Sequence, residues 1–130
     1  MTPEALLYTR IREALGPEWD TQRIENVIGR GCPDITTSNK RTGDVWIEAK
    51  AGDHAKPLIR PEQYAWMKRR AHMGGQCCII TQRKEDRLWF VWPIYDGVVF
   101  TSVGSYLIPK YPAHETTRLA GQLNDYYGNA

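Results

Sequence analysis

The sequence has few cysteines, and their arrangement argues against a disulfide framework or a zinc module. The three cysteines are Cys32, Cys77 and Cys78, an odd number of which two are adjacent. Adjacent residues on a strand point to opposite faces, so Cys77 and Cys78 are poorly placed to share a bridge or a metal. No CxxC pair and no zinc-type histidine spacing is present. We therefore expect three reduced thiols, of the kind found buried in a core.

The chain also lacks long apolar stretches. No apolar run approaches the roughly 18 residues needed to cross a bilayer. No charged segment followed by an apolar one opens the sequence, so we expect a cytoplasmic protein without a membrane partner. A length of 130 residues fits one compact domain, residues 1–130.

A strong charge of one sign is absent too, since the net charge is only +2. Overall charge therefore does not indicate nucleic acid, but the basic residues are clustered. Three consecutive basic residues lie after Tyr64 in an expected helix, and further pairs of basic residues lie in expected loops. Such clusters either contact phosphates or form solvated surface, and the pattern alone leaves both open. The candidates for DNA contacts are Lys40, Arg41, Lys56, Arg60, Lys68 and Arg69.

Capping signals place the first two helices. Thr2-Pro3-Glu4 is typical of a helix start, with a capping hydroxyl, a proline at the first helical position and an acid in the first turn. This helix is expected to run to about Leu15 and to end at Gly16-Pro17. A second helix is expected from Pro61 to Gly74-Gly75.

Alternation and turn residues place the strands. Strands are expected over residues 22–28, 34–38, 44–51 and 76–82. A hairpin of 88–94 and 98–102 around Asp96-Gly97 should follow, and then a last helix over 113–127. The order predicts an α/β fold, in which helices flank a mixed central β-sheet and a C-terminal hairpin and helix are added.

The strands over 34–38 and 44–51 place two acids together. If they form an antiparallel hairpin centred on Arg41, Thr36 faces Trp46 and Asp34 faces Glu48. Directly opposed residues have Cβ atoms about 4.5–5.5 Å apart, where two carboxylates repel each other. A divalent cation between them removes this penalty, because Mg²⁺ takes oxygen ligands.

Lys50 lies two residues beyond Glu48 on the same face, about 6.6 Å along the strand. It is near enough to act on a water or phosphate held beside the acids. The alternative is an exposed Glu-x-Lys pair on a solvated face, which is common and contributes little. The register match with Asp34 favours the site over this alternative.

These motifs resemble a known family. Gly-Cys-Pro-Asp (31–34), then Trp-Ile-Glu-Ala-Lys (46–50), is similar to the motif of PD-(D/E)XK nucleases. With Pro-Glu-Gln (61–63) at a helix start, the pattern resembles the VRR-NUC branch, which includes stand-alone phage and prophage proteins and is akin to archaeal-type Holliday junction resolvases. The resemblance covers about residues 2–82 and implies a restriction-endonuclease-like αβββαβ core. It leaves an extension of about 83–130 unexplained.

The resemblance implies roles for the motif residues. Asp34, Glu48 and the main-chain carbonyl of Ala49 would bind Mg²⁺ or Mn²⁺, with no organic cofactor. Lys50 would activate the attacking water and offset charge in the transition state. Gln63 matches a family glutamine near the active site, although a cap in the first helical turn would explain it too. The cellular setting implied is the cytoplasm of a bacterial or phage-infected cell.

Family members usually add an acid from the first helix. Glu4 shares a helical stripe with Leu7, Ile11 and Leu15, which is the expected buried face. A carboxylate on that face needs a partner, which a metal site would supply. Otherwise Glu4 only complements the helix dipole. Glu25, on the first expected strand, is a second candidate.

The leading functional hypothesis is Mg²⁺-dependent endonucleolytic hydrolysis of DNA, selective for branched or Holliday-junction-like structures. The alternatives are a non-catalytic DNA-binding module on a nuclease fold, a partner-binding phage protein, and a single-strand nickase or flap-type nuclease.

Paired incision of a four-way junction would require a homodimer. The aromatic-rich segment 88–111 offers material for its interface. The alternative is that the last helix covers this segment within one chain through Leu119, Leu123 and Tyr126.

Overall fold

The computed structural model describes residues 1–24 and 31–128. A six-stranded sheet, in the order β1-β2-β3-β4-β5-β8, forms its centre, and β6 and β7 pair in a separate ribbon. The pairing of β3 with β4 is parallel and the other pairings are antiparallel, so the sheet is mixed, as predicted. The strands are β1 (Gln22–Arg23), β2 (Ile35–Asn39), β3 (Gly43–Ala49), β4 (Cys77–Gln82), β5 (Trp89–Ile94), β6 (Phe100–Val103), β7 (Tyr106–Pro109) and β8 (His114–Thr116). The helices are α1 (Pro3–Leu15), α2 (Pro61–His72) and α3 (Leu119–Tyr127).

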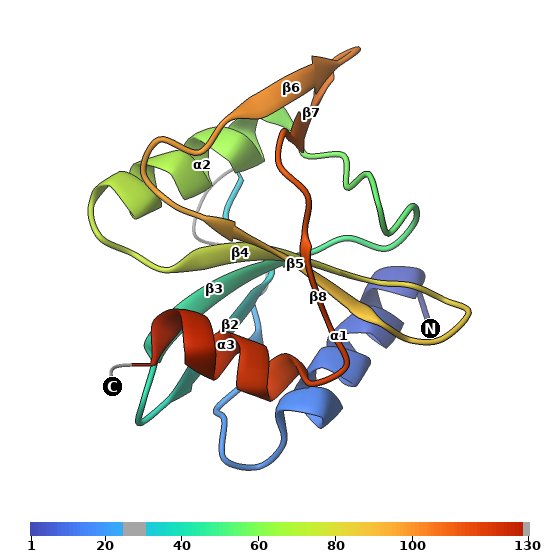
Figure 1. The fold of residues 1–130 in the computed structure, drawn as a ribbon, viewed down its shortest axis with the longest axis vertical. Coiled ribbons are helices and arrows are strands. Elements are labelled where there is room, and N and C mark those ends of the chain that lie inside the picture. Colours follow the sequence, from blue (N-terminus) through green and yellow to red (C-terminus); the bar gives the residue numbers. More distant parts are fainter. Residues whose placement is uncertain (25–30, 129–130) are drawn as a thin grey trace.

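The helices cover the two faces of the sheet (Figure 1). α1 and α3 pack on one face, over an apolar cluster that contains Ile47, Val91 and Leu123. α2 and the β6–β7 ribbon cover the other face, over a cluster built around Met67 and Ile79. Side chains alternate along β3, so this strand contributes to both layers. Val45, Ile47 and Ala49 all face the first cluster, and the residues between them face the other side of the sheet.

Both expected helix starts are confirmed. Thr2 Oγ1 accepts a hydrogen bond from the backbone N–H of Ala5 at 3.1 Å, and α1 ends at Gly16, whose φ of 86° takes the chain out of the helix. α2 begins at Pro61 and stops before Gly74. The helix boundaries therefore follow from local chemistry that the sequence displays.

The hairpin register is also confirmed. Ile35 pairs with Ile47, Thr36 with Trp46 and Asn39 with Gly43, so the turn is centred on Arg41. Asn39 Oδ1 accepts hydrogen bonds from the backbone N–H groups that follow it, which closes the turn. Of the first expected strand, residues 22–23 form β1, and residues 25–28 lie outside the described part of the chain.

The C-terminal part differs from expectation. The hairpin of 88–94 with 98–102 is wrong: β5 pairs with β4 and β8 in the central sheet, while β6 pairs with β7. Asp96-Gly97 does form a turn, but the apolar β5 is completed by the long β4 rather than by its sequence neighbour. The last helix begins at Leu119 and not at 113, because residues 114–116 form β8.

The aromatic segment 88–111 is buried mainly in β5, and its residues from Val99 onward are all exposed or half-buried. Trp89 and Val91 belong to the cluster that Leu119 and Leu123 of α3 complete, so the single-chain alternative holds for this face of β5. Phe90 and Trp92, on its other face, pack in the cluster around Met67 instead. The large apolar side chains of this segment that remain exposed are Tyr95, Val99, Val103, Tyr106 and Tyr111. No helix in the described ranges is long and apolar enough to cross a membrane.

Candidate active site

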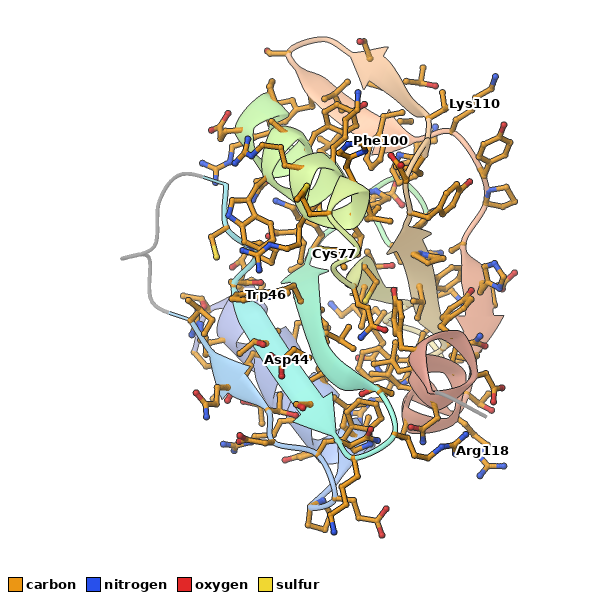
Figure 2. All side chains as sticks on the ribbon, turned by 90° about the vertical axis from the view of Figure 1, so that its left-hand side faces the viewer. Asp44, Trp46, Cys77, Phe100, Lys110 and Arg118 are labelled. Atoms are coloured by element: carbon orange, nitrogen blue, oxygen red, sulfur yellow. The ribbon has the colours of Figure 1, made fainter. Side chains whose placement is uncertain are left out.

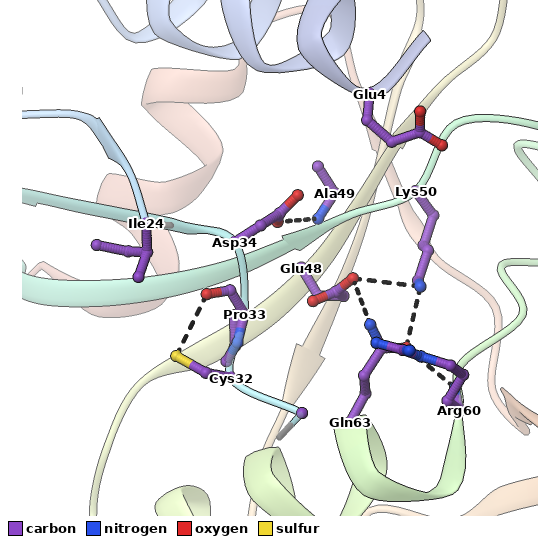
Figure 3. A pocket seen from close by; sticks show the side chains of 11 residues that line it. Glu4, Ile24, Cys32, Pro33, Asp34, Glu48, Ala49, Lys50, Arg60 and Gln63 are labelled. Carbon is purple, nitrogen blue, oxygen red and sulfur yellow. Dashed lines mark hydrogen bonds and ion pairs between the residues drawn. The ribbon is translucent and has the colours of Figure 1, made fainter. Parts of the chain in front are cut away.

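The two predicted acids meet where β2 begins and β3 ends. The ladder of β2 and β3 closes with Ile35 opposite Ile47, so the next positions outward are Asp34 and Glu48. Both side chains line one polar cavity of about 290 Å³ (Figure 3). The remaining lining residues are Glu4, Ile24, Gly31, Cys32, Pro33, Ala49, Lys50, Arg60 and Gln63.

Glu48 is held in a buried ring of polar contacts. Its side chain is only 5% exposed. Gln63 Nε2 donates to Glu48 Oε2 at 3.0 Å, and Lys50 Nζ lies 3.2 Å from the same oxygen. Lys50 Nζ also donates to Gln63 Oε1 at 3.0 Å, which closes a triangle of three side chains (Figure 3).

The electrostatics of the two acids follow from their burial. Burial raises the pKa of Glu48 to about 7, and the negative charge of Asp34 adds to the rise, while Lys50 opposes it. Burial also raises the pKa of Asp34, which the hydrogen bond from the Ala49 backbone N–H opposes. Two carboxylates that resist ionisation beside each other favour a bound cation.

The donor set fits a hard divalent cation. Among the described residues, both polar contacts of the Glu48 carboxylate end on Oε2. In the same ranges, no group of three or more His, Cys, Asp or Glu side chains could hold a metal by itself. Mg²⁺ does not require such a cage, since it is commonly bound by one or two carboxylates together with waters and substrate phosphates.

Gln63 combines the two roles that its sequence position allowed. It is 5% exposed, and its amide nitrogen contacts Glu48. Its Oε1 also accepts from the backbone N–H of Arg60 at 3.0 Å, which caps the start of α2. The capping bond fixes the side chain in the orientation that reaches the acid.

Gly31 brings the start of α2 against the Asp34 loop, a contact that sequence reasoning missed. Its φ is +85°, and a Cβ there would lie 2.1 Å from the Glu62 carbonyl oxygen and 2.9 Å from the Gln63 backbone nitrogen. The two backbones approach this closely because the residue has no side chain. The motif glycine was visible in the sequence, but its contact partner, thirty residues on, was not.

The two candidates for a fourth acid fare differently. Glu4 lines the cavity from the first turn of α1, but it is exposed, so its expected place on the buried face is wrong. Its stripe companions Leu7, Ile11 and Leu15 are buried. Glu25 lies outside the described residues.

The basic candidates fall into three places. Arg60 lines the cavity, and Lys56 is exposed in the loop before it. Lys68 and Arg69 are exposed on α2. Lys40 and Arg41 occupy the β2–β3 turn, about 20 Å along the strand from Asp34, so the structure does not bring them to the cavity.

Comparison with known proteins gives a fold. No protein-family model matches the chain, and no curated protein matches it in sequence. Among solved structures, the Holliday junction resolvase Hjc of the archaeal hyperthermophile Archaeoglobus fulgidus is similar, with a TM-score of 0.61 and 16% identity. The match covers 92% of this chain and 97% of that one. The restriction-endonuclease-like arrangement is therefore shared along nearly the whole chain.

Proposed function

We propose that this protein is a metal-dependent DNA endonuclease of the PD-(D/E)XK type, with the VRR-NUC branch as its nearest pattern. One observation carries the proposal: Asp34 and Glu48 share a polar cavity with Lys50 on a fold similar to that of a Holliday junction resolvase. A surface pair of opposite charges would not be buried and bonded to a third polar side chain, as Glu48 and Lys50 are to Gln63.

Each cavity residue has a distinct task in the proposed reaction. Asp34, Glu48 and the Ala49 carbonyl would hold Mg²⁺ or Mn²⁺, a cation that supplies Lewis-acid polarisation of the scissile phosphate. Lys50 places a positive charge where negative charge develops on the phosphate and orients the attacking water. Gln63 keeps the ammonium group of Lys50 and the carboxylate of Glu48 in fixed relation.

Basic side chains around the cavity would hold the DNA backbone. Arg60 in the cavity wall and Lys56 beside it are placed to contact phosphates next to the cleaved bond, with Lys68 and Arg69 further along α2. Exposed Glu4 at the opposite wall would contribute a water-mediated contact to the metal. Lys40 and Arg41 would reach only DNA that extends past the hairpin turn.

Branched DNA is the proposed substrate, cut by a homodimer. Two-fold pairing would present two cavities to the two strands that a four-way junction requires to be cut. The exposed side chains of Tyr95, Val99, Val103, Tyr106 and Tyr111 offer the apolar part of an interface. Light scattering at micromolar concentration should give twice the 14.9 kDa chain mass. A monomer would leave a nickase or flap-type nuclease.

The proposal is tested by cleavage of labelled four-way, flap, single-stranded and duplex DNA with Mg²⁺, Mn²⁺ or EDTA. We expect metal-dependent cuts, fastest on the branched substrates, and none in EDTA. Metal-independent binding without any cleavage would instead establish a non-catalytic DNA-binding module. A protein that neither binds nor cuts DNA would overturn both.

A further inference from the structure

Arg70, on the last turn of α2, is stacked against two tryptophans. Its guanidinium carbon lies 4.4 Å from the ring centroid of Trp66 and 5.3 Å from that of Trp46. The two rings meet edge to face, with centroids 5.2 Å apart. Trp66 is one helical turn before Arg70, and Trp46 comes from β3, so the cluster joins the helix to the sheet.

The position of the guanidinium is fixed by its stem. Gly75 packs against it so closely that a Cβ there would lie 2.5 Å from the Arg70 Cγ and 2.6 Å from its Cδ. The Gly75 backbone N–H also donates to the Arg70 carbonyl at 2.8 Å. An arginine held in this way loses little further conformational freedom when it binds a ligand.

The charge of Arg70 is not neutralised by a neighbouring acid. Across residues 1–24 and 31–128, it forms no salt bridge. Arg83, by contrast, forms a 2.6 Å pair with Asp86, although it also lies over an aromatic ring. Arg70 is exposed, and within the described ranges its guanidinium donates no hydrogen bond, which leaves N–H donors that could bind an anion.

The cluster adjoins the cavity that holds Asp34 and Glu48. Trp46, labelled in Figure 2, lies two residues before Glu48 on β3. The two side chains therefore face the same side of the sheet, about 6.6 Å apart along the strand. Cys32 lines the cavity and also packs in the apolar cluster that contains Trp46 and Trp66.

The chemistry of the cluster selects a phosphate rather than a base. Stacking a nucleobase requires an open aromatic face, and here the guanidinium covers Trp66 and lies over Trp46. What remains available is a planar fork of N–H donors, whose geometry matches two oxygens of a phosphodiester. The tryptophans would serve to aim this fork.

We propose that Arg70 binds one backbone phosphate of the DNA strand whose scissile phosphate lies at Asp34 and Glu48. This inference rests on the proposed nuclease function and adds a subsite to it. Arg70 fixes the register of the strand from one side of the cavity, while Arg60 lies on the other, in the cavity wall.

The test measures DNA binding in Ca²⁺, with wild type and Arg70→Gln, on oligonucleotides in which one phosphate at a time is a neutral methylphosphonate. We expect Arg70→Gln to weaken binding about tenfold and to lower the salt slope by about one unit. Wild type should lose affinity at one modified position near the cut site, and Arg70→Gln should lose nothing more there. Arg70→Lys, which keeps the charge but not the fork, should retain the salt slope with weaker binding.

Arg12→Gln is the matched control, because Arg12 also lies over an aromatic ring, that of Tyr8 at 5.6 Å, but lines a hollow that shares no residue with the cavity. It should bind like wild type. Equal sensitivity of wild type and Arg70→Gln to every methylphosphonate would overturn the subsite while leaving the nuclease function intact. If Arg70→Gln fails to fold, an Arg70→Lys variant that binds DNA as tightly as wild type overturns it equally. A wild-type protein without DNA binding or cleavage would remove both proposals.

Discussion

The two ends of β3 carry acids on the same face, and they differ in almost every other respect. Asp44 and Glu48 are four residues apart, so both side chains project to the side of α2. Asp44 pairs across the hairpin with Ser38 and is exposed, and in the described part of the chain its carboxylate forms no salt bridge. Glu48 is buried, continues the ladder opposite Asp34, and contacts Lys50 and Gln63.

This difference distinguishes an ordinary surface acid, Asp44, from an acid in a candidate active site, Glu48. The carboxylate at the open end of the strand is exposed to solvent. Glu48, at the α2 end of the strand, is buried and therefore loses its hydration. Hydrogen-bond donors and a second acid surround it, although an apolar residue would be cheaper to bury there. Such an arrangement is unfavourable for the protein alone, and the proposed cation would offset its cost.

The largest expected effect is on cleavage. Glu48→Gln or Asp34→Asn should lower the single-turnover rate by about 10³-fold or more, roughly 4 kcal/mol, because each removes a charged oxygen ligand. Calorimetric titration with Mn²⁺ should lose its binding signal in both variants. Asp44→Asn, on the same strand and face, is the control and should cut DNA like wild type. Equal rates for Glu48→Gln and Asp44→Asn would contradict the site assignment.

The next largest effect concerns Lys50, the positively charged member of the triangle that it forms with Glu48 and Gln63. Lys50→Ala should slow single-turnover cleavage by about 10²-fold, roughly 2.7 kcal/mol, with little change in DNA affinity measured in Ca²⁺. Lys110→Ala, which removes an exposed lysine after β7, should change neither quantity. A large affinity loss with a normal rate at saturation would make Lys50 a phosphate contact and not a group that acts on the transition state.

The close backbone approach at Gly31 should make this glycine more costly to replace than a glycine in an open turn. Gly31→Ala introduces a Cβ against the Glu62 carbonyl, whereas Gly97→Ala, at a similar φ of +89°, meets nothing within 4 Å. Gly97→Ala should therefore cost only the left-handed strain, about 1 kcal/mol. Gly31→Ala should cost at least about 1 kcal/mol more in urea unfolding and should also slow cleavage, because α2 carries Gln63. Equal unfolding midpoints would remove the packing role.

The parts that the sequence predicted correctly are those encoded locally. The caps of α1 and α2, the turn around Arg41 and the alternation of β3 each depend on a few neighbouring residues. The turn and the alternation also predicted that Asp34 faces Glu48. Gln63 was recognised as inward-facing because its helical stripe is apolar. Each of these features depends on residues that lie close to one another in the sequence.

The parts that failed depend on distant pairing. The partner of β5 is chosen between β4, β8 and β6 by competition for apolar contacts, which no window around Asp96-Gly97 contains. The same holds for the contact of Gly31 with α2 and for the stacking of Arg70 on Trp46, whose partners come from other elements. Residues whose structural role depends on contacts with distant elements cannot be distinguished in the sequence from ordinary surface or loop residues.

The smallest effect tests directly whether Glu48 is unfavourable in the empty cavity. In the folded protein its pKa is about 7, against an ordinary 4.5, and that value already includes the attraction of Lys50. Because the folded protein holds this proton more tightly than the unfolded chain does, the stability contributed by Glu48 falls as the pH rises from about 4.5 to 7 and stays low above it. The shift corresponds to roughly 3 kcal/mol.

Glu48→Gln removes that charge at the cost of contacts to Lys50 and Gln63, so we expect a net stabilisation of about 1 kcal/mol at pH 8 in EDTA. The difference should vanish below about pH 4.5, where the carboxyl is neutral in both states. Thermal unfolding of Glu48→Gln, Asp44→Asn and wild type at the two pH values measures this, and Asp44→Asn should match wild type at both. A Glu48→Gln variant that melts below wild type at pH 8 would mean that the polar triangle stabilises the fold by itself, and the contrast between the two ends of β3 would then be structural.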